Sequence, residues 1–295
     1  MLTIGPVVET GSTTPPAPSW AGVGTCALAE TDLARRQPAP RRLDFHLMAL
    51  TTAGHGTVEI DFTTHECRPG TLLCIQPGQA VRFGGEDGFD AALVSWRGDP
   101  LAGEELIGVP AESHQLTGAD EDAMISEFAQ LAEDRGRLRE GPIAAALLRH
   151  QLAVLLLRVA LLTGAEDEAP PTAEARTFAR FRSALEAGHA ESRRVEDYAA
   201  RLGCSVRTLT RASLAITGRT AKQVVDDRVA LEARRLLACT SLSVAEVGRR
   251  LGFPEPTNFG RFFHREVGES PGAFRAAATG VRENHRIPAQ RPPTD

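Results

Sequence analysis

The sequence predicts an α+β fold in two domains, an N-terminal sandwich or small barrel with two helices and an all-α C-terminal domain. Three observations support this division. Short apolar runs broken by glycine, proline and aspartate occupy the first third of the chain. Helical periodicity dominates after residue 119, and two copies of a helix–tight turn–helix pattern follow near the end. The length of 295 residues suffices for two cores.

The strands are expected between residues 21 and 96. Residues 1–20 are rich in threonine and proline, and we expect them to form a disordered arm. Pro69-Gly70 and Pro77-Gly78 mark turns. The runs that read as strands at close spacing are 43–50, 56–60, 71–77, 80–83 and 89–96. That rhythm favours a sandwich or a small barrel.

Two helices are expected next, at 119–136 and 142–163. In the second, Arg149 and Arg158 oppose a membrane-spanning interpretation, because each central arginine costs about 2.5–3.5 kcal/mol in a bilayer. Apolar residues step by three and four from Ala145 onward, as in an a/d seam. Core packing explains this spacing about as well as dimerisation. We favour a homodimer because the apolar surface extends beyond the seam, whose members are Leu148, Leu152, Leu155, Val159 and Leu162.

Charge divides the chain in the same way as the patterns do. Residues 165–175 read as a linker, 176–280 as the second domain and 281–295 as a disordered tail. From Phe181 to Asp295 there are 19 basic and 13 acidic residues, a net charge of +6, whereas the remainder carries −11. Unevenly solvated faces would produce some asymmetry, but a basic second half suggests a polyanionic partner for that half.

The five cysteines are odd in number, scattered, and without a C-x-x-C pair. This pattern opposes a disulfide framework or a structural zinc site and suits a reducing cytoplasm. Residues 1–20 lack the charged and apolar regions of a signal peptide. A thiol sensor built on Cys67 and Cys74 remains an alternative interpretation.

An internal repeat organises the basic half. At an offset of 49, Val195, Tyr198, Arg201, Leu202 and Gly203 match Val244, Val247, Arg250, Leu251 and Gly252. At an offset of 50, Leu209, Arg211 and Gly218 match Phe259, Arg261 and Gly268. The one-residue change lies in the turn, where an insertion is tolerated. Two helix–tight turn–helix units are therefore expected.

Each unit carries its own start signals. Ser205 is the expected N-cap in the first copy, Ser243 and Glu246 form a capping box in the second, and Pro256 suits a first helical position. The residues expected to face inward are Leu209 and Ile216, then Phe259, Phe262 and Phe263. The residues expected to face outward are Arg207, Thr210 and Arg211, then Thr257, Asn258, Arg261 and Arg265.

Outward polar stripes on paired helices suit DNA. A helix-turn-helix places its second helix in the major groove. Arginine there can bind guanine and asparagine can bind adenine, each good pair giving about 1–3 kcal/mol of discrimination. One polar stripe alone is usually just solvated, but two equivalent stripes in a basic domain favour binding of double-stranded DNA.

The segment GFPEPTNFGRFF…GESP and its surroundings resemble the DNA-binding domain of AraC/XylS transcription regulators over about residues 182–280. The resemblance implies a double helix-turn-helix domain joined by a long helix near 221–237. It also implies contacts about ten base pairs apart in adjacent major grooves. Carried over by position, the base-facing candidates are Arg207, Thr210 and Arg211, then Thr257, Asn258 and Arg261. Ser213 stands where the family usually has a large apolar residue.

The N-terminal half resembles the family's cupin-like β-barrel, so residues 21–164 are expected to bind an effector and to dimerise. A metal-binding cupin needs an H-x-H pair, which His46 lacks, and we expect neither metal nor cofactor. His46 and Met48 should share one strand face. The candidate effector-binding residues are His46, Met48, Arg82 and Trp96.

These features together predict a cytoplasmic, effector-controlled transcription regulator that is neither an enzyme nor membrane-bound. RNA polymerase would be a further partner if the protein is an activator. The alternatives are a cupin-type enzyme or a thiol redox sensor fused to a DNA-binding module, and a constitutive regulator whose barrel only dimerises.

Overall fold

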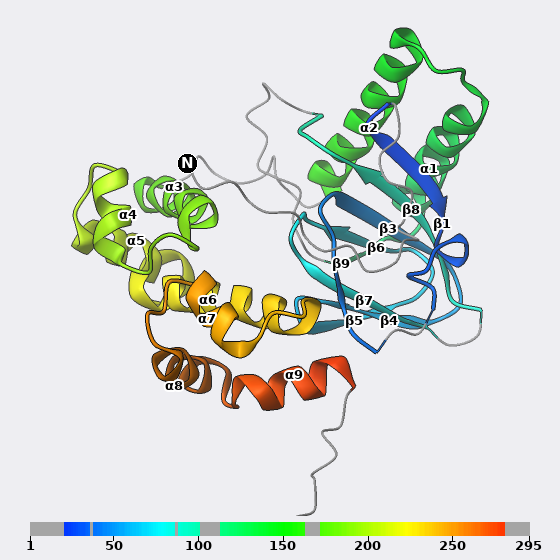
Figure 1. The fold of residues 1–295 in the computed structure, drawn as a ribbon. Coiled ribbons are helices and arrows are strands. Elements are labelled where there is room, and N and C mark those ends of the chain that lie inside the picture. Colours follow the sequence, from blue (N-terminus) through cyan, green and yellow to red (C-terminus); the bar gives the residue numbers. More distant parts are fainter. Residues whose placement is uncertain (1–20, 36–37, 86–87, 101–112, 163–171, 281–295) are drawn as a thin grey trace, which may run out of the picture. The chain divides into compact units, whose positions relative to one another are not determined.

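A computed structural model describes residues 21–35, 38–85, 88–100, 113–162 and 172–280 (Figure 1). The chain divides into two compact units, with Pro171 starting the main body of the second. The arm expected at 1–20 and the tail expected at 281–295 lie outside the described residues, as does most of the expected linker.

The first unit contains two antiparallel sheets, which Figure 1 shows facing each other. The larger has the order β1-β8-β3-β6-β9, and the smaller has the order β2-β7-β4-β5. Their strands are β1 (Val23–Ala27), β2 (Arg41–Arg42), β3 (His46–Ala53), β4 (Gly56–Ile60), β5 (Thr63–Cys67), β6 (Thr71–Ile75), β7 (Ala80–Gly85), β8 (Asp90–Trp96) and β9 (Ser113–Gln115). A short 3-10 helix, η1 (Leu28–Glu30), follows β1.

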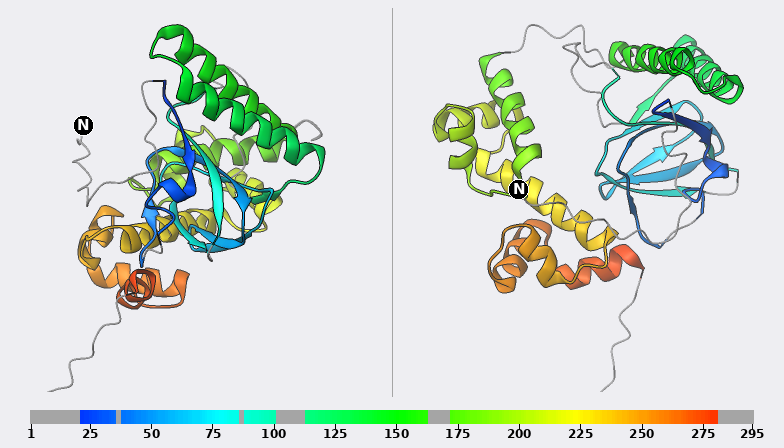
Figure 2. Two further views of the ribbon diagram at one scale, coloured as in Figure 1. Left: turned by 90° about the vertical axis from the view of Figure 1, so that its right-hand side faces the viewer. Right: turned by 45° about the horizontal axis from the view of Figure 1, so that its top comes forward.

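Two cores lie on opposite faces of the five-stranded sheet. Because side chains alternate along a strand, Leu47 and Ala49 of β3 point between the sheets, whereas Met48 and Leu50 point the other way. The inter-sheet core also includes Phe45, Val58, Ile60, Val81, Phe83 and Leu93. The helix-side core joins the sheet's other face to α1 (Ala119–Arg137) and α2 (Pro142–Leu162), which cover it in Figure 2.

The apolar seam of α2 is used inside its own domain. Leu148, Leu152, Leu155 and Val159 are buried in the helix-side core, and Leu162 packs against it. The expected dimer seam is therefore wrong, because α1 and the sheet already cover that face of the helix. The length and apolar composition of α2 would also allow it to span a membrane, but the core helix of a soluble protein meets the same two criteria.

The runs predicted as strands missed four strands, namely β1, β2, β5 and β9. β2 and β9 are very short, and β5 (TTHEC) is polar because all but its last residue stay at least partly accessible. β4 and β5 form a hairpin through Asp61 and Phe62, both with positive φ. Positive φ at both central positions is the pattern of a type I′ turn, which is unusual for phenylalanine.

The second unit is all helical. Its helices are α3 (Ala173–Gly188), α4 (Val195–Arg201), α5 (Val206–Thr217), α6 (Ala221–Cys239), α7 (Val244–Arg250), α8 (Pro256–Val267) and α9 (Pro271–Thr279). The Thr172 side chain accepts a hydrogen bond from the Ala175 amide and starts α3. Residues 173–175, expected in the linker, are therefore helical.

The local start signals operate as the sequence predicts. Ser205 accepts a hydrogen bond from the Thr208 amide, Ser243 and Glu246 form the capping box, and Pro256 opens α8. Ile216 differs from expectation, because its side chain is 48% exposed. It lies in the last turn of α5, beyond the residues of that helix that are buried.

Candidate nucleic-acid interface and ligand pocket

The outward faces of α5 and α8 carry the six residues predicted to meet bases. On α5, Arg207 and Arg211 are exposed and Thr210 is partly exposed; their spacing of three and four places them on one face. On α8, the exposed residues are Thr257, Asn258 and Arg261. Each trio is thus brought together on the accessible face of its own helix.

Arg211 has a partner within the domain. Its Nε lies 3.4 Å from Oε1 of Glu174 in the first turn of α3. The Arg211 side chain is largely exposed, and such surface pairs contribute only about 0–1 kcal/mol. A phosphate or a guanine edge can therefore compete for the guanidinium.

Aromatic packing holds the buried side of α8. Phe253 lies 5.4 Å from Phe259 and 5.0 Å from Phe262, ring centre to ring centre. A Cβ at Gly248 of α7 would lie 3.0 Å from the Cβ of Phe259, so only glycine fits there without a shift. The close approach of α7 and the aromatic cluster fix which face of α8 remains outside.

The buried side of α5 is built from smaller residues. Leu209, Ala212 and Ser213 are buried there, and the Ser213 hydroxyl donates a hydrogen bond of 2.8 Å to the Leu209 carbonyl. Serine is accommodated in this core because its hydroxyl is satisfied within the helix.

Buried charges attach α6 to its neighbours. Asp226 pairs with Lys222 on its own helix and with Arg265 of α8, at 3.6 Å. Glu232 lies 3.3 Å from the Arg228 Nη1 and 3.7 Å from the His189 Nε2 beyond α3. Removing one partner from such a buried pair is costly, so these contacts hold α6 in a fixed orientation.

The four residues expected to bind an effector do not form one site. His46 stacks on Trp96 with ring centres 5.0 Å apart, and burial lowers the pKa of His46. Met48 is fully buried in the helix-side core. Arg82 pairs with Glu59 at 2.6 Å, between Val81 and Phe83 that point inward, so it lies on the outer face of the other sheet. The structure thus brings His46, Met48 and Trp96 to one face of the larger sheet and leaves Arg82 apart from them, on the other sheet.

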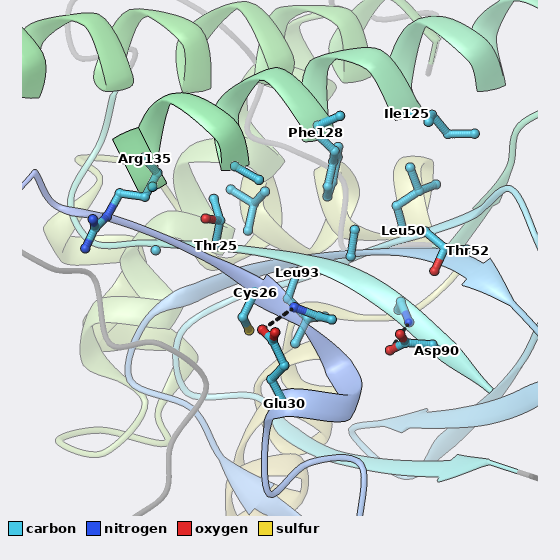
Figure 3. Close-up of a pocket in the computed structure, with 18 residues that line it drawn as sticks. Thr25, Cys26, Glu30, Leu50, Thr52, Asp90, Leu93, Ile125, Phe128 and Arg135 are labelled. Atoms are coloured by element: carbon cyan, nitrogen blue, oxygen red, sulfur yellow. Dashed lines mark hydrogen bonds between the residues drawn. The ribbon is translucent and has the colours of Figure 1, made fainter. Parts of the chain in front are cut away.

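A pocket of about 600 Å³ lies instead between α1 and the β1-β8-β3 part of the sheet (Figure 3). From α1 it is lined by Ile125, Phe128, Ala129, Ala132, Arg135 and Gly136. From the sheet it includes Thr25, Cys26, Leu50, Thr52 and Asp90, with Glu30 of η1. No pattern in the sequence points to this pocket, because its lining residues are spread over five elements and share no regular spacing.

One part of this pocket is acidic. Asp90 accepts hydrogen bonds from the backbone amides of Ala29 and Ala91, and Glu30 accepts one from Ala27. Burial, followed by the carboxylates of Glu30 and Asp90, raises the pKa of Cys26 to about 12. The Cys26 thiol is therefore neutral at physiological pH.

The cysteines proposed for redox sensing lie apart. Cys67 belongs to the inter-sheet core and Cys74 to the helix-side core, on opposite faces of the larger sheet. Burial raises their pKa values to about 11 and about 12. Thiolates are the reactive form, so neither cysteine is activated. Within the described residues, no group of three or more His, Cys, Asp or Glu side chains is arranged to hold a metal.

A second stripe on α2 is exposed. It has the same alternating steps of four and three as the buried seam and could have been found in the same way. We define the exposed stripe as Ile143, Leu147, His150, Val154, Leu157 and Leu161. Ile143 is the most accessible, at 85%.

Comparisons with known proteins agree with this architecture. An AraC-like ligand-binding domain matches residues 24–153, and a helix-turn-helix domain matches residues 198–277. The chain is 27% identical over 250 residues to the HTH-type transcriptional activator RhaS of Salmonella arizonae, covering 81% of this chain and 87% of the relative. The RhaS protein of Salmonella schwarzengrund matches equally.

Two solved structures were also compared. The DNA-binding domain of AdpA in complex with a target DNA is 36% identical, covering 37% of this chain and 96% of that one, with a TM-score of 0.33. ToxT from Vibrio cholerae is 10% identical, covering 88% and 99%, with a TM-score of 0.46.

Proposed function

The chain belongs to the AraC family of DNA-binding transcription regulators, and from that premise we propose that α5 and α8 read its DNA site. The base-reading residues in this proposal are Arg207, Thr210, Arg211, Thr257, Asn258 and Arg261. The observation that carries it is duplication: two equivalent helices bury one face and leave a polar stripe on the other.

The side chains suggest what each helix recognises. Arg211 and Arg261 stand at equivalent positions and suit the O6 and N7 acceptors of guanine, whereas Asn258 suits the adenine edge. Two such helices entering successive major grooves contact bases about ten base pairs apart. The target is therefore a bipartite site.

The pocket beneath α1 is our proposed effector site. Ile125, Phe128 and Leu50 suit an apolar ligand body, and the carboxylates of Glu30 and Asp90 suit a hydrogen-bond donor or a cation. A ligand that contacts α1 would favour one position of the hairpin formed by α1 and α2. Because α2 carries the exposed stripe, that change would alter how two copies of the chain associate.

We also propose that the exposed stripe of α2 pairs with that of a second copy. A two-fold axis brings identical patches together, and heptad spacing over 19 residues suits helix pairing. Leu147→Glu combined with Leu157→Glu should convert the dimer to monomer in sedimentation equilibrium. An unchanged dimer mass would contradict the proposal that this stripe forms the dimer interface.

The competing functions have less support in the molecule. The separation and raised pKa of Cys67 and Cys74 oppose a redox switch. We infer a regulator without catalytic activity, located in the cytoplasm with its DNA. The relatives named as activators support RNA polymerase as a further partner.

The decisive experiment selects bound sequences from fragmented DNA with the purified full-length protein. The winning site is then titrated with candidate small molecules. We expect two motifs about ten base pairs apart and an affinity that one molecule shifts. A selected site whose affinity no small molecule changes would favour the alternative, a constitutive regulator whose barrel only dimerises. No enriched site, with or without ligands, would contradict the DNA-reading assignment.

A further inference from the structure

The two helix-turn-helix units are joined mainly through α6. This helix contacts α4 and α5 of the first helix-turn-helix and α7, α8 and α9, which form or follow the second. Arg193, in the connection between α3 and α4, makes a contact that bypasses α6. Its Nη2 donates a hydrogen bond of 3.0 Å to the carbonyl of Gly252, and its guanidinium carbon lies 3.6 Å from the ring centre of Phe253.

The partners of Arg193 form the tight turn before α8. Gly252 has φ of +74°, which only glycine adopts without strain, and Phe253 is buried against Phe259 and Phe262 of α8. Arg193 therefore holds the element that determines where α8 begins. Movement of the first helix-turn-helix relative to this turn would break both contacts.

Arginine is the residue type that this contact requires. A planar guanidinium can stack on a ring and donate in its own plane at the same time, which an ammonium group cannot do. Burial lowers the pKa of Arg193, and the carboxylate of Asp226 on α6 opposes that effect. At the equivalent position before the second helix-turn-helix the chain has Leu242. A helix-turn-helix therefore does not itself require arginine there.

We propose that Arg193 is a positioning residue that fixes the separation and rotation between α5 and α8. It thereby sets which spacing between the two DNA motifs the protein accepts. The inference rests on the proposed reading of DNA by both helices. Adding one base pair between the motifs moves the second by about 3.4 Å and 34–36°, so a rigid pair of helices discriminates strongly against it.

The test compares Arg193→Ala and Arg193→Lys with Arg194→Ala in the full-length protein. Arg194 is the matched control, because it is exposed and its ion pair with Glu196 is a 3.7 Å surface contact. Affinity is measured on the selected bipartite site, on versions with one base pair inserted or removed, and on versions with one motif scrambled. Thermal unfolding shows whether each variant is folded.

Both Arg193 variants should bind the natural spacing about fivefold more weakly, as expected for loss of a partly desolvated stacking contact of roughly 1 kcal/mol. Their preference for natural over altered spacing should fall by a similar factor, while binding to single motifs stays unchanged. Arg194→Ala should keep the full preference. An equal loss on single motifs, or an unchanged spacing preference, would overturn the proposal, as would Arg193→Lys behaving like wild type.

A second measurement needs no DNA. Spin labels built in as non-natural amino acids at the exposed positions Ala215 and His264 report the distance between α5 and α8. The distance distribution should broaden in Arg193→Ala and not in Arg194→Ala. Failure to find any DNA site would count against the proposed reading helices, whereas an unchanged distribution would count against the role of Arg193.

Discussion

Two arginines one turn apart on α8 show how surroundings decide the role of a residue. Arg265 pairs with Asp226 of α6 and with Glu266, and lies over the ring of Phe262. Arg261 is exposed on the polar face beside Asn258. The first is occupied in holding the helix, and the second is available to a base.

Arg261→Ala should therefore relax specificity at one base position and weaken binding by about 1–3 kcal/mol, leaving the unfolding temperature nearly unchanged. Binding to a library of single-base variants of the selected site measures both effects. Arg265→Ala, as the comparison, should lower the unfolding temperature instead. A uniform loss across all sequences for Arg261→Ala would mean that it contacts only phosphate.

The buried thiols predict how stability depends on pH. The folded-state pKa values of Cys26, Cys67 and Cys74 are raised from 9.0 to about 12, about 11 and about 12. The folded protein holds these protons more tightly than the unfolded chain, so their contribution is complete below pH 9 and is lost as pH rises toward 11–12.

Urea unfolding between pH 7 and 10.5 should thus show stability falling above pH 9. Replacing the three cysteines with alanine should flatten that decline, even if it lowers stability at pH 7. An identical alkaline decline in the triple variant would assign it to other groups.

At the scale of elements, α2 shows what spacing can and cannot reveal. Steps of three and four identified a real apolar face, but not that α1 and the sheet cover it. A second face with the same spacing remains exposed on the same helix. Strand alternation has the same limit: it placed His46 and Met48 together without showing which side of the sheet they occupy. Periodicity defines faces, and only tertiary packing assigns their partners.

Neighbouring leucines on α2 separate the two roles. Leu148 is fully buried and Leu147 is 43% exposed. Leu148→Ala should cost about 2–5 kcal/mol of unfolding free energy, since it leaves a cavity in the core. Leu147→Ala should cost far less and instead weaken self-association. Denaturant titration and sedimentation equilibrium distinguish them, and equal destabilisation by both would contradict the assignment of faces.

At the scale of the whole molecule, local sequence signals predicted most of the second unit. N-caps, the capping box, proline at the first helical position and the phenylalanine spacing all act within a few residues, so they can be read along the chain. The pocket beneath α1 depends on residues brought together from β1, η1, β3, β8 and α1. Such long-range assembly leaves no periodic signal.

The uneven distribution of charge makes a prediction for the intact protein. Arginines that neutralise phosphates release counterions, so affinity for the selected site should fall steeply between 50 and 200 mM salt, by about 10³ or more if six phosphates are contacted. Fluorescence anisotropy with the full-length protein measures the slope. A flat response would contradict DNA binding by the basic unit.

The length of α6 has a consequence for how this protein can change over generations. One residue inserted into a helix turns everything after it by about 100° and shifts it by about 1.5 Å. In the 19 residues of α6, that insertion would rotate α8 relative to α5, and under the proposed reading of DNA by both helices α8 would then miss its groove. Because residues are added or removed one at a time, the length of α6 can change only in steps of about 1.5 Å and 100°. Lineages can lengthen the turns, where the two copies already differ by one residue, but an altered α6 would require a new DNA site.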